Sequence, residues 1–333
     1  MRKLLALLLS LSLLLVPTAC SPSAQQPQAP DVPAQSSSSG GEEIEYPKSL
    51  VIAASNVGNI WYNNAVKISE ILMANFPGMS VTVIEGGGDA NIDAVNQGTD
   101  VQLALTSSTS LLPALAGTNN EVTDASNVYA LMSCGQSVAQ TAVLADSDIQ
   151  DFPDLVGKRV AAGDYKQVAM YTFLALLDAY GIPQEDVQIQ AASSSEYPDM
   201  FSDGLLDACH INGNLPLSTL VQIDSGDPIR LLQPSQEAVK TLLEKYPSFY
   251  TVDVPAGQYA GQTEPLTLLA YDGMLIANKD LPGPFLAKLV ELVTEDATLD
   301  PAQFSRAHWD AYPTFISADN TAPEVWAAIE AHQ

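Results

Sequence analysis

A repeated order of apolar run, small polar turn and helical segment constrains the fold of this chain more than any other feature. Three copies occupy residues 49–75, 79–98 and 100–117. Each starts with aliphatic and β-branched residues, turns at Gly, Ser, Thr or Asn, and continues with helical periodicity. Strands joined through helices run parallel, because the helix returns the chain to the same edge of the sheet. The repeat therefore predicts an α/β fold with a helix-covered sheet.

A second set of such units follows along the chain. Its clearest member is a helical segment at residues 167–181, which ends at Gly181 with Pro183 beyond it, as the C-termini of helices prefer. Further short strands are expected at residues 158–164, 187–193, 205–211 and 229–233.

Two longer stretches connect the sets and predict that the chain crosses between two lobes twice. Residues 130–148 hold two apolar stretches in one run, and residues 249–277 do the same. In open α/β sheets ligands bind beyond the carboxyl ends of the strands, so we expect a ligand cleft between the lobes. The expected division is residues 47–140 and 255–333 for lobe 1, residues 141–254 for lobe 2, and hinge strands near Ser137–Leu144 and Val252–Asp272.

The N-terminal segment has the pattern of an export signal. Arg2 and Lys3 precede an apolar run at residues 4–16, which is too short to span a membrane. Residues 18–20, "TAC", resemble the end of a bacterial lipobox, in which the cysteine is lipidated, although Pro17 stands where that motif usually has Leu or Val.

We therefore expect a signal peptide at residues 1–20 and an anchor to the outer face of a membrane through lipidated Cys20. A plain secretory signal, cut near the same place, is the alternative. Residues 21–46 consist largely of Ser, Pro, Gln and Gly, a composition that buries too little surface to fold, so we expect a disordered tether.

The charge balance excludes some classes of partner. The chain has 39 acidic and 13 basic residues, a net charge of -26. Nucleic acid and anionic lipid surfaces need a basic face, so neither is an expected partner. A small anion remains possible, because helix N-termini and backbone N–H groups bind anions locally. We expect a monomer.

Cysteine and histidine usage argues against a metal site and against catalysis. Cys134 and Cys209 lie in apolar surroundings and are expected to be buried free thiols, with pairing left open. The chain has only three histidines and lacks CxxC and HExxH motifs, so we expect no metal, no cofactor and no enzyme activity.

Five stretches resemble the TAXI subfamily of solute receptors from tripartite ATP-independent (TRAP) transporters, and the resemblance covers about residues 49–290. They stand in the family's order. They are "GNIWYNNAVKISEIL", "GGGDANIDAVNQGTDVQLAL", "FPDLVGKRVAAG", "DGLLDACHINGNLP" and "VDVPAGQYAGQ" with the following "LTLLAYDGMLIANKDLP". The resemblance implies a two-lobed periplasmic-binding-protein-like fold of type II. It also implies delivery of a small organic acid or amino acid to integral membrane TRAP permease subunits.

The resemblance and the strand-end turns together give a set of candidate ligand-binding residues. In the second lobe this chain has "GDYKQVAM" where the family usually has a Gly-Ser-Gly turn, so we expect the charged side chain of Lys166 to replace part of the backbone N–H donation there. The candidates are Asn56, Asn59, Trp61, Tyr62, Gly87, Gly88, Asp89, Asn91, Thr106, Ser107, Asp164, Tyr165, Lys166, Gln167, Asn212 and Asn214.

Several candidates have a structural alternative. Trp61 and Tyr62 suit an apolar wall of the cleft or simple core packing. The glycines at residues 86–88 give clearance for a ligand or only a tight turn. Lys166 suits a carboxylate or a solvated surface, Asp89 suits an ammonium or a helix cap, and the hydroxyls at residues 106–108 suit caps as well as ligand donors.

Two other functions remain open at this point. The same receptor fold could present its ligand to a membrane signalling partner such as a kinase, as a sensing lipoprotein. An enzyme on a bilobed frame would need a clustered acid, base or nucleophile, and no motif of this kind is present.

Overall fold

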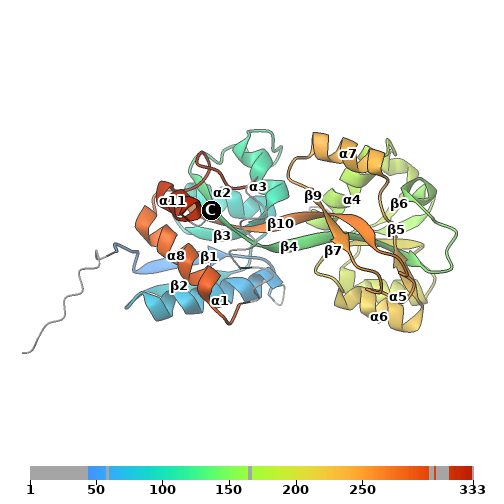
Figure 1. Ribbon diagram of the computed structural model, residues 1–333, viewed down its shortest axis with the longest axis horizontal. Helices are drawn as coiled ribbons and strands as arrows, with labels where there is room; N and C mark the ends of the chain where they lie inside the picture. The colour runs from blue at the N-terminus through green and yellow to red at the C-terminus, as the bar shows by residue number, and fades with distance from the viewer. Residues whose placement is uncertain (1–43, 58–59, 164–166, 300–303, 305–314, 332–333) are drawn as a thin grey trace, which may run out of the picture. The chain divides into compact units, whose positions relative to one another are not determined.

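A ten-stranded mixed sheet runs through the part of the chain that the structure describes (Figure 1). The computed structural model describes residues 44–57, 60–163, 167–299, 304 and 315–331, all within one compact unit, Ile44–Gln333. The strand order is β2-β1-β3-β10-β4-β7-β5-β6, with β8 paired to β4 and β9 paired to β10. The strands are β1 (Ser49–Ala53), β2 (Ser80–Ile84), β3 (Leu103–Ser107), β4 (Val128–Leu144), β5 (Arg159–Ala161), β6 (Gln188–Gln190), β7 (Ala208–Gly213), β8 (Ile229–Leu231), β9 (Tyr250–Val254) and β10 (Leu266–Asn278).

Helices follow the strands in both halves of the sheet. In Figure 1, α1, α2, α3, α8 and α11 surround β1–β3, and α4–α7 surround β5–β7. The helices are α1 (Ile60–Asn75), α2 (Gly88–Gln97), α3 (Ser108–Leu115), α4 (Val168–Ala179), α5 (Tyr197–Ser202), α6 (Ser218–Gly226), α7 (Gln236–Lys245), α8 (Gly283–Glu295) and α11 (Pro323–Glu330), with 3-10 turns η1 (Phe152–Leu155), η2 (Gln184–Asp186) and η3 (Ser194–Glu196).

The two sets of strand–helix units form two parallel groups. β1 pairs in parallel with β2 and β3, and β5 pairs in parallel with β6 and β7. The elements confirm the prediction from hydrophobic periodicity. The segment expected to be helical at residues 167–181, for example, is helix α4.

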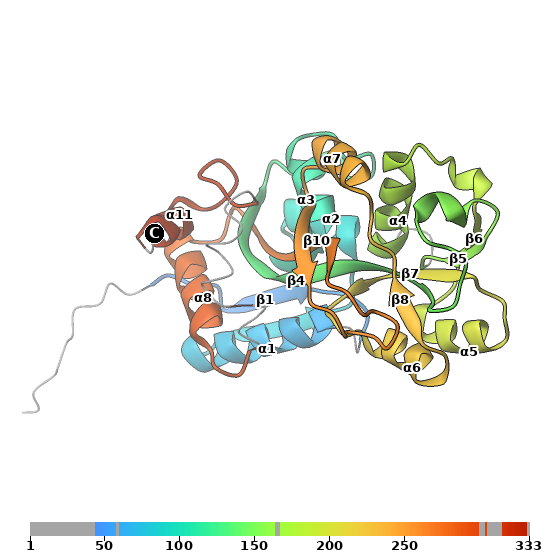
Figure 2. The ribbon, with the colours of Figure 1, turned by 45° about the vertical axis from the view of Figure 1, so that its right-hand side comes forward.

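Strands β4 and β10 connect the two groups and pair with each other antiparallel. They run side by side from one group of helices to the other (Figures 1 and 2). β10 also pairs with β3, and β4 also pairs with β7. The central pair therefore joins the two parallel groups into one continuous sheet. This central antiparallel pair is the main difference from the expected parallel pattern, and it arises because each strand passes from one group to the other.

Hydrophobic clusters define the two lobes. The buried members of one cluster, called lobe 1 here, come from residues 50–134 and 274–329. Two further clusters, one containing Phe173 and the other Leu220, together make lobe 2, and their buried members lie between Val138 and Tyr271. In β4 the cluster changes between Cys134 and Val138, at the start of the first expected hinge range. In β10 it changes between Tyr271 and Met274, at the end of the second expected range.

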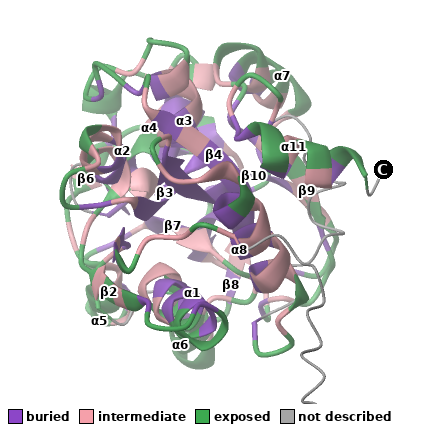
Figure 3. Ribbon diagram, turned by 90° about the vertical axis from the view of Figure 1, so that its left-hand side faces the viewer, coloured by how far each residue is buried: buried purple, intermediate pink, exposed green. Residues whose placement is uncertain are grey.

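The central strands are the most deeply buried elements. All five residues of β3 are buried, and so are the last eleven residues of β10. Figure 3 shows these strands inside helices whose outer faces are exposed. Strands covered on both faces read as continuous apolar runs, which explains the composition of these segments.

Candidate functional site

Asn91 joins two of the predicted strand-end turns and strand β3 by hydrogen bonds. Its side chain is 2% exposed. The Nδ2 group donates to the carbonyl oxygens of Ala54, after β1, and Leu105, in β3, both at 2.7 Å. Its Oδ1 accepts from the backbone N–H of Gly87 at 3.0 Å. Both N–H bonds of the Asn91 amide are therefore used inside the protein, so this candidate residue positions the turns around it.

The hydroxyl groups at the end of β3 complete this arrangement. Thr106 Oγ1 donates to the carbonyl oxygen of Gly88 at 3.0 Å, which joins the third turn to the second. Ser107 Oγ accepts from the backbone N–H of Ser110 at 3.1 Å and lies 2.8 Å from Thr109 Oγ1. Ser107 is thus the N-cap of α3, which confirms the capping alternative for this residue.

Trp61 brings the first turn to the same place. Its indole covers Gly273 of β10, and a Cβ atom at Gly273 would lie 3.1 Å from Trp61 Nε1. Gly273 is the register partner of Ser107. Trp61 packs against the lobe 1 cluster and against one lobe 2 cluster, whereas Tyr62 packs against lobe 1. Trp61 therefore lies at the boundary between the lobes, next to the hydroxyl-rich end of β3.

Two further described candidates of lobe 1 are Asp89 and Asn56. Asp89 lies in the first turn of α2, and its Oδ1 accepts from Asn119 Nδ2 at 3.0 Å. This bond fixes the carboxylate near the Gly87–Gly88 turn. Asn56 is exposed after β1. Sequence reasoning did not include Asn119, since it lies in a loop far from Asp89 along the chain.

In lobe 2, Asn212 lies at the end of β7 within a cluster of polar side chains. Its Nδ2 donates to Thr172 Oγ1 at 3.0 Å and to the Tyr271 hydroxyl at 3.4 Å. Asn212 Oδ1 and His210 Nε2 are buried and have no hydrogen-bond partner among the described residues. Burial lowers the pKa of His210 to about 3, an effect that the nearby Asn212 amide opposes only in part. His210 is therefore neutral at ordinary pH.

The first turn of lobe 2 is described only at its ends. Gly163 has φ +86°, a backbone conformation that favours glycine, and its N–H donates to the Tyr197 hydroxyl at 2.6 Å. Gln167 is exposed at the N-cap of α4. Asn214 is exposed too, and its carbonyl oxygen accepts from Gln140 Nε2 at 3.4 Å. The candidates that lie outside the described residues are Cys20, Asn59, Asp164, Tyr165 and Lys166.

Ser108 links these turns to the crossing strands. Its hydroxyl donates to the carbonyl oxygen of Ser248 at 3.0 Å and accepts from the backbone N–H of Asp272 at 3.1 Å. The first residue of α3 is therefore bonded to the segment that precedes β9 and to β10. The turns of lobe 1 and the hinge strands thus form one hydrogen-bonded assembly.

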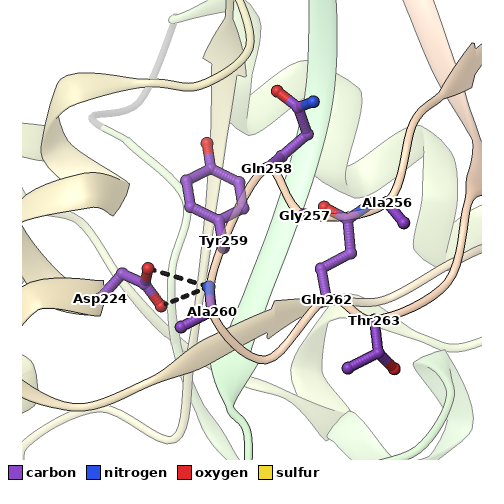
Figure 4. A pocket seen from close by; sticks show the side chains of 8 residues that line it. All are labelled: Asp224, Ala256, Gly257, Gln258, Tyr259, Ala260, Gln262 and Thr263. Atoms are coloured by element: carbon purple, nitrogen blue, oxygen red, sulfur yellow. Dashed lines mark hydrogen bonds between the residues drawn. The ribbon is translucent and has the colours of Figure 1, made fainter.

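A shallow pocket of about 580 Å³ lies elsewhere in lobe 2 (Figure 4). It is lined by Asp224 and by residues of the loop 256–263 between β9 and β10. The Asp224 carboxylate accepts the backbone N–H groups of Ala260, at 3.0 and 3.1 Å, and of Ile229, at 2.9 Å. None of the candidate residues lines this pocket, and its carboxylate holds the loop, so we do not take it for the ligand site.

The thiols and the acidic groups offer little reactive chemistry. Burial raises the pKa of Cys134 and of Cys209, the latter to about 12, so both thiols stay protonated. Both are free, as expected. Within the described ranges, no three or more His, Cys, Asp and Glu side chains gather in a way that could hold a metal ion. The same ranges contain no helix with the length and apolar character needed to cross a bilayer.

Comparison with known proteins identifies the family of this chain and proteins of similar fold. A model of the NMT1-like family matches residues 52–302. Among solved structures, one described as a periplasmic transporter is 16% identical, with a TM-score of 0.50 over 87% of this chain and 96% of that chain. The periplasmic aliphatic sulphonate binding protein SsuA from Escherichia coli is 15% identical, with a TM-score of 0.47 over 85% and 83% of the two chains.

The substrate binding protein of an amino acid ABC transporter is also similar, at 13% identity and a TM-score of 0.42 over 79% of this chain and 96% of that chain. These structures are described as binding or transport proteins, not as enzymes. With the observed topology, the match at a TM-score of 0.50 confirms the expected fold, a mixed α/β periplasmic-binding-protein fold of type II.

Proposed function

The chain belongs to the NMT1-like family, and from this premise we propose that it is an extracytoplasmic solute-binding receptor that delivers a small organic acid or amino acid to a membrane permease. The observation that supports this most is the convergence of strand-end turns at the boundary between two lobes. Thr106 bonds to Gly88 there, and Trp61 and Ser107 both meet Gly273 of β10. In folds of this class the ligand lies where such turns meet.

Polar groups of both lobes would bind the solute. Lobe 1 offers the Asp89 carboxylate, which Asn119 holds in place. In lobe 2, Lys166 is the basic side chain nearest in sequence to the turn after β5, and it would pair with a carboxylate of the solute. A site with an acidic and a basic side chain suits a zwitterion, so we favour an amino acid over a simple acid as the solute.

The permease would be of the TRAP type, as the resemblance of the five quoted stretches implies. Lipidation at Cys20 would hold the receptor at the outer face of the membrane. The tether would be shorter than the expected residues 21–46, because Ile44 and Tyr46 pack against the lobe 1 cluster. The sulphonate and amino acid binding proteins in the comparisons support the general class of receptor. The alternative partner is a membrane sensor, which co-purification of the receptor with candidate membrane proteins would distinguish.

Ligand titration tests the proposal. A panel of amino acids and dicarboxylates is added to the purified protein while tryptophan emission and the melting temperature are followed. A ligand at 100 times its Kd stabilises the folded state by about 2.7 kcal/mol. With an unfolding entropy of about 2.1 cal/mol/K per residue, this raises the Tm of the folded unit by about 4–5 °C. No shift with any member of a broad metabolite panel would contradict the proposal.

Two lysine variants separate the site from the surface. Lys166→Ala is expected to weaken binding of a carboxylate-bearing solute by at least about tenfold, since a hydrogen bond to a charged group contributes about 1.5–3 kcal/mol. Lys240→Ala is the matched control, because the Lys240 side chain is 77% exposed on α7 and lies 3.9 Å from its acidic partner, Glu244. Equal affinities of the two variants would remove Lys166 from the site.

A further inference from the structure

The boundary between the lobes contains a buried carboxylate on a crossing strand. Asp272 of β10 is fully buried, and it lies between Tyr271, a lobe 2 core residue, and Met274, a lobe 1 core residue. The pairing of β10 with β4 shifts register between Asp272 and Met274. Gly135, with φ +106°, lies opposite this shift. The extra residue on β4 makes a bulge at the point where both strands pass from one lobe to the other.

Two hydroxyl groups donate to this carboxylate from opposite sides of the boundary. Ser133 Oγ, in the lobe 1 half of β4, donates to Asp272 Oδ2 at 2.6 Å. The Tyr250 hydroxyl donates to Asp272 Oδ1, and Gln136 Nε2 donates to the Tyr250 hydroxyl at 3.2 Å. Tyr250 belongs to β9, which pairs with the lobe 2 half of β10, at residues 266–270. Ser133 and Tyr250 thus donate to the carboxylate from different lobes.

The ring of Tyr250 also touches both lobes. It packs against the lobe 1 cluster and against the lobe 2 cluster that contains Leu220, and its centroid lies 5.9 Å from that of Phe315 in lobe 1. Trp61 covers the neighbouring residue, Gly273, and contacts the other lobe 2 cluster. Because successive residues of a strand face opposite sides of the sheet, the crossing is held by one aromatic side chain on each side.

We propose that the Tyr250–Asp272 hydrogen bond is a latch that fixes the angle between the lobes, and that losing it changes the population of lobe arrangements. A buried carboxylate is strongly stabilised by its donors, so an arrangement that pulls the Tyr250 hydroxyl away leaves the charge with fewer donors. Ser133 lies in the lobe 1 half of β4, so we expect its bond to Asp272 to depend less on the angle between the lobes than the Tyr250 bond does. This inference goes beyond solute binding and does not depend on which solute is bound.

Distance measurements between spin labels test the latch without a ligand. Labels are attached to cysteines introduced by Glu70→Cys in α1 and Lys240→Cys in α7, whose native side chains are 56% and 77% exposed. A Cys20→Ser background avoids a third label, because Cys134 and Cys209 are buried. The test compares Tyr250→Phe with Ser133→Ala. Each removes one hydroxyl donor from the same carboxylate, so both are expected to lower the Tm, by about 2–6 °C.

The two variants differ in the expected distances. Tyr250→Phe keeps the ring but is expected to broaden or displace the inter-label distances, whereas Ser133→Ala is expected to leave them as in the parent. Unchanged distances in Tyr250→Phe, or an equal change in both variants, would overturn the latch. Asp272→Asn provides a second route if Tyr250→Phe does not fold. It keeps the shape of the side chain, removes one acceptor oxygen, and is also expected to displace the distances, and an unchanged distribution would overturn the proposal.

Discussion

Replacing Asn91 by alanine tests whether this side chain positions the predicted binding turns. The substitution leaves the carbonyl oxygens of Ala54 and Leu105 and the N–H of Gly87 without their present partners, in a place where the side chain is 2% exposed. A hydrogen bond contributes about 1 kcal/mol net to stability, and groups left buried and unbonded add to the loss. We therefore expect Asn91→Ala to lower the free energy of unfolding by at least about 3 kcal/mol.

Guanidinium unfolding followed by circular dichroism measures this loss, and thermal unfolding is expected to show a fall in Tm of about 5 °C for a unit of this size. Asn75→Ala is the matched control. Asn75 is exposed at the end of α1 and donates one bond, to the carbonyl oxygen of Ile71 at 2.9 Å, so its loss is expected to stay within about 0.5 kcal/mol. A loss below about 1 kcal/mol for Asn91→Ala would refute the reasoning, because the two buried bonds and the part-buried one cannot then be contributing.

Three further predictions concern the lobe boundary and the buried polar groups. Gly273→Ala places a methyl group about 3.1 Å from the present position of Trp61 Nε1, so we expect the indole to move and its emission maximum to shift. Cys134 and Cys209 are expected to resist a thiol reagent at pH 8 in the folded protein and to react after unfolding, since burial raises the pKa of both thiols. Burial lowers the pKa of His210 from 6.5 to about 3, so only the unfolded chain gains this proton, and we expect stability to fall as the pH drops from about 6.5 toward 3.

Each of these has its own control. Gly226→Ala adds a methyl group that meets no atom within 4 Å, and it is expected to leave the emission unchanged. Reaction of Cys209 in the folded state at the unfolded rate would contradict its burial. For the histidine, urea unfolding gives the free energy of unfolding of the parent and of His210→Gln at pH 7.5 and pH 5. The value for His210→Gln is expected to change less between the two pH values. If the free energy of unfolding changes equally between the two pH values in both proteins, other groups cause the pH dependence.

Local elements of this fold could be predicted because their signals lie within a few residues. The run before α1 and the apolar segment of α4 have the periods of a strand and a helix, and both formed as expected. The position of β10 between β3 and β4 could not, since those partners lie far away in sequence and strand propensity does not specify a partner.

The meeting of the strand-end turns could be predicted from the sequence, but the hydrogen bonds between them could not. Convergence at β3 followed from the general rule for open α/β sheets, and Thr106 and Gly88 do meet. That the Asn91 amide bonds backbone on three sides depends on distances that no motif encodes. Asp272 did have a signal, a carboxylate within the apolar run "LLAYDGMLIA", because a charge in a buried strand needs donors from other elements.

The double crossing of β4 and β10 also affects how this chain completes its fold during synthesis. The core of lobe 1 needs residues from 274 to 329 in addition to those before 134, and its strand β3 has β10 as a neighbour. A chain that has emerged only as far as lobe 2 therefore lacks the strand that closes its first half. The early part of the chain therefore cannot complete its native core before the late part is made.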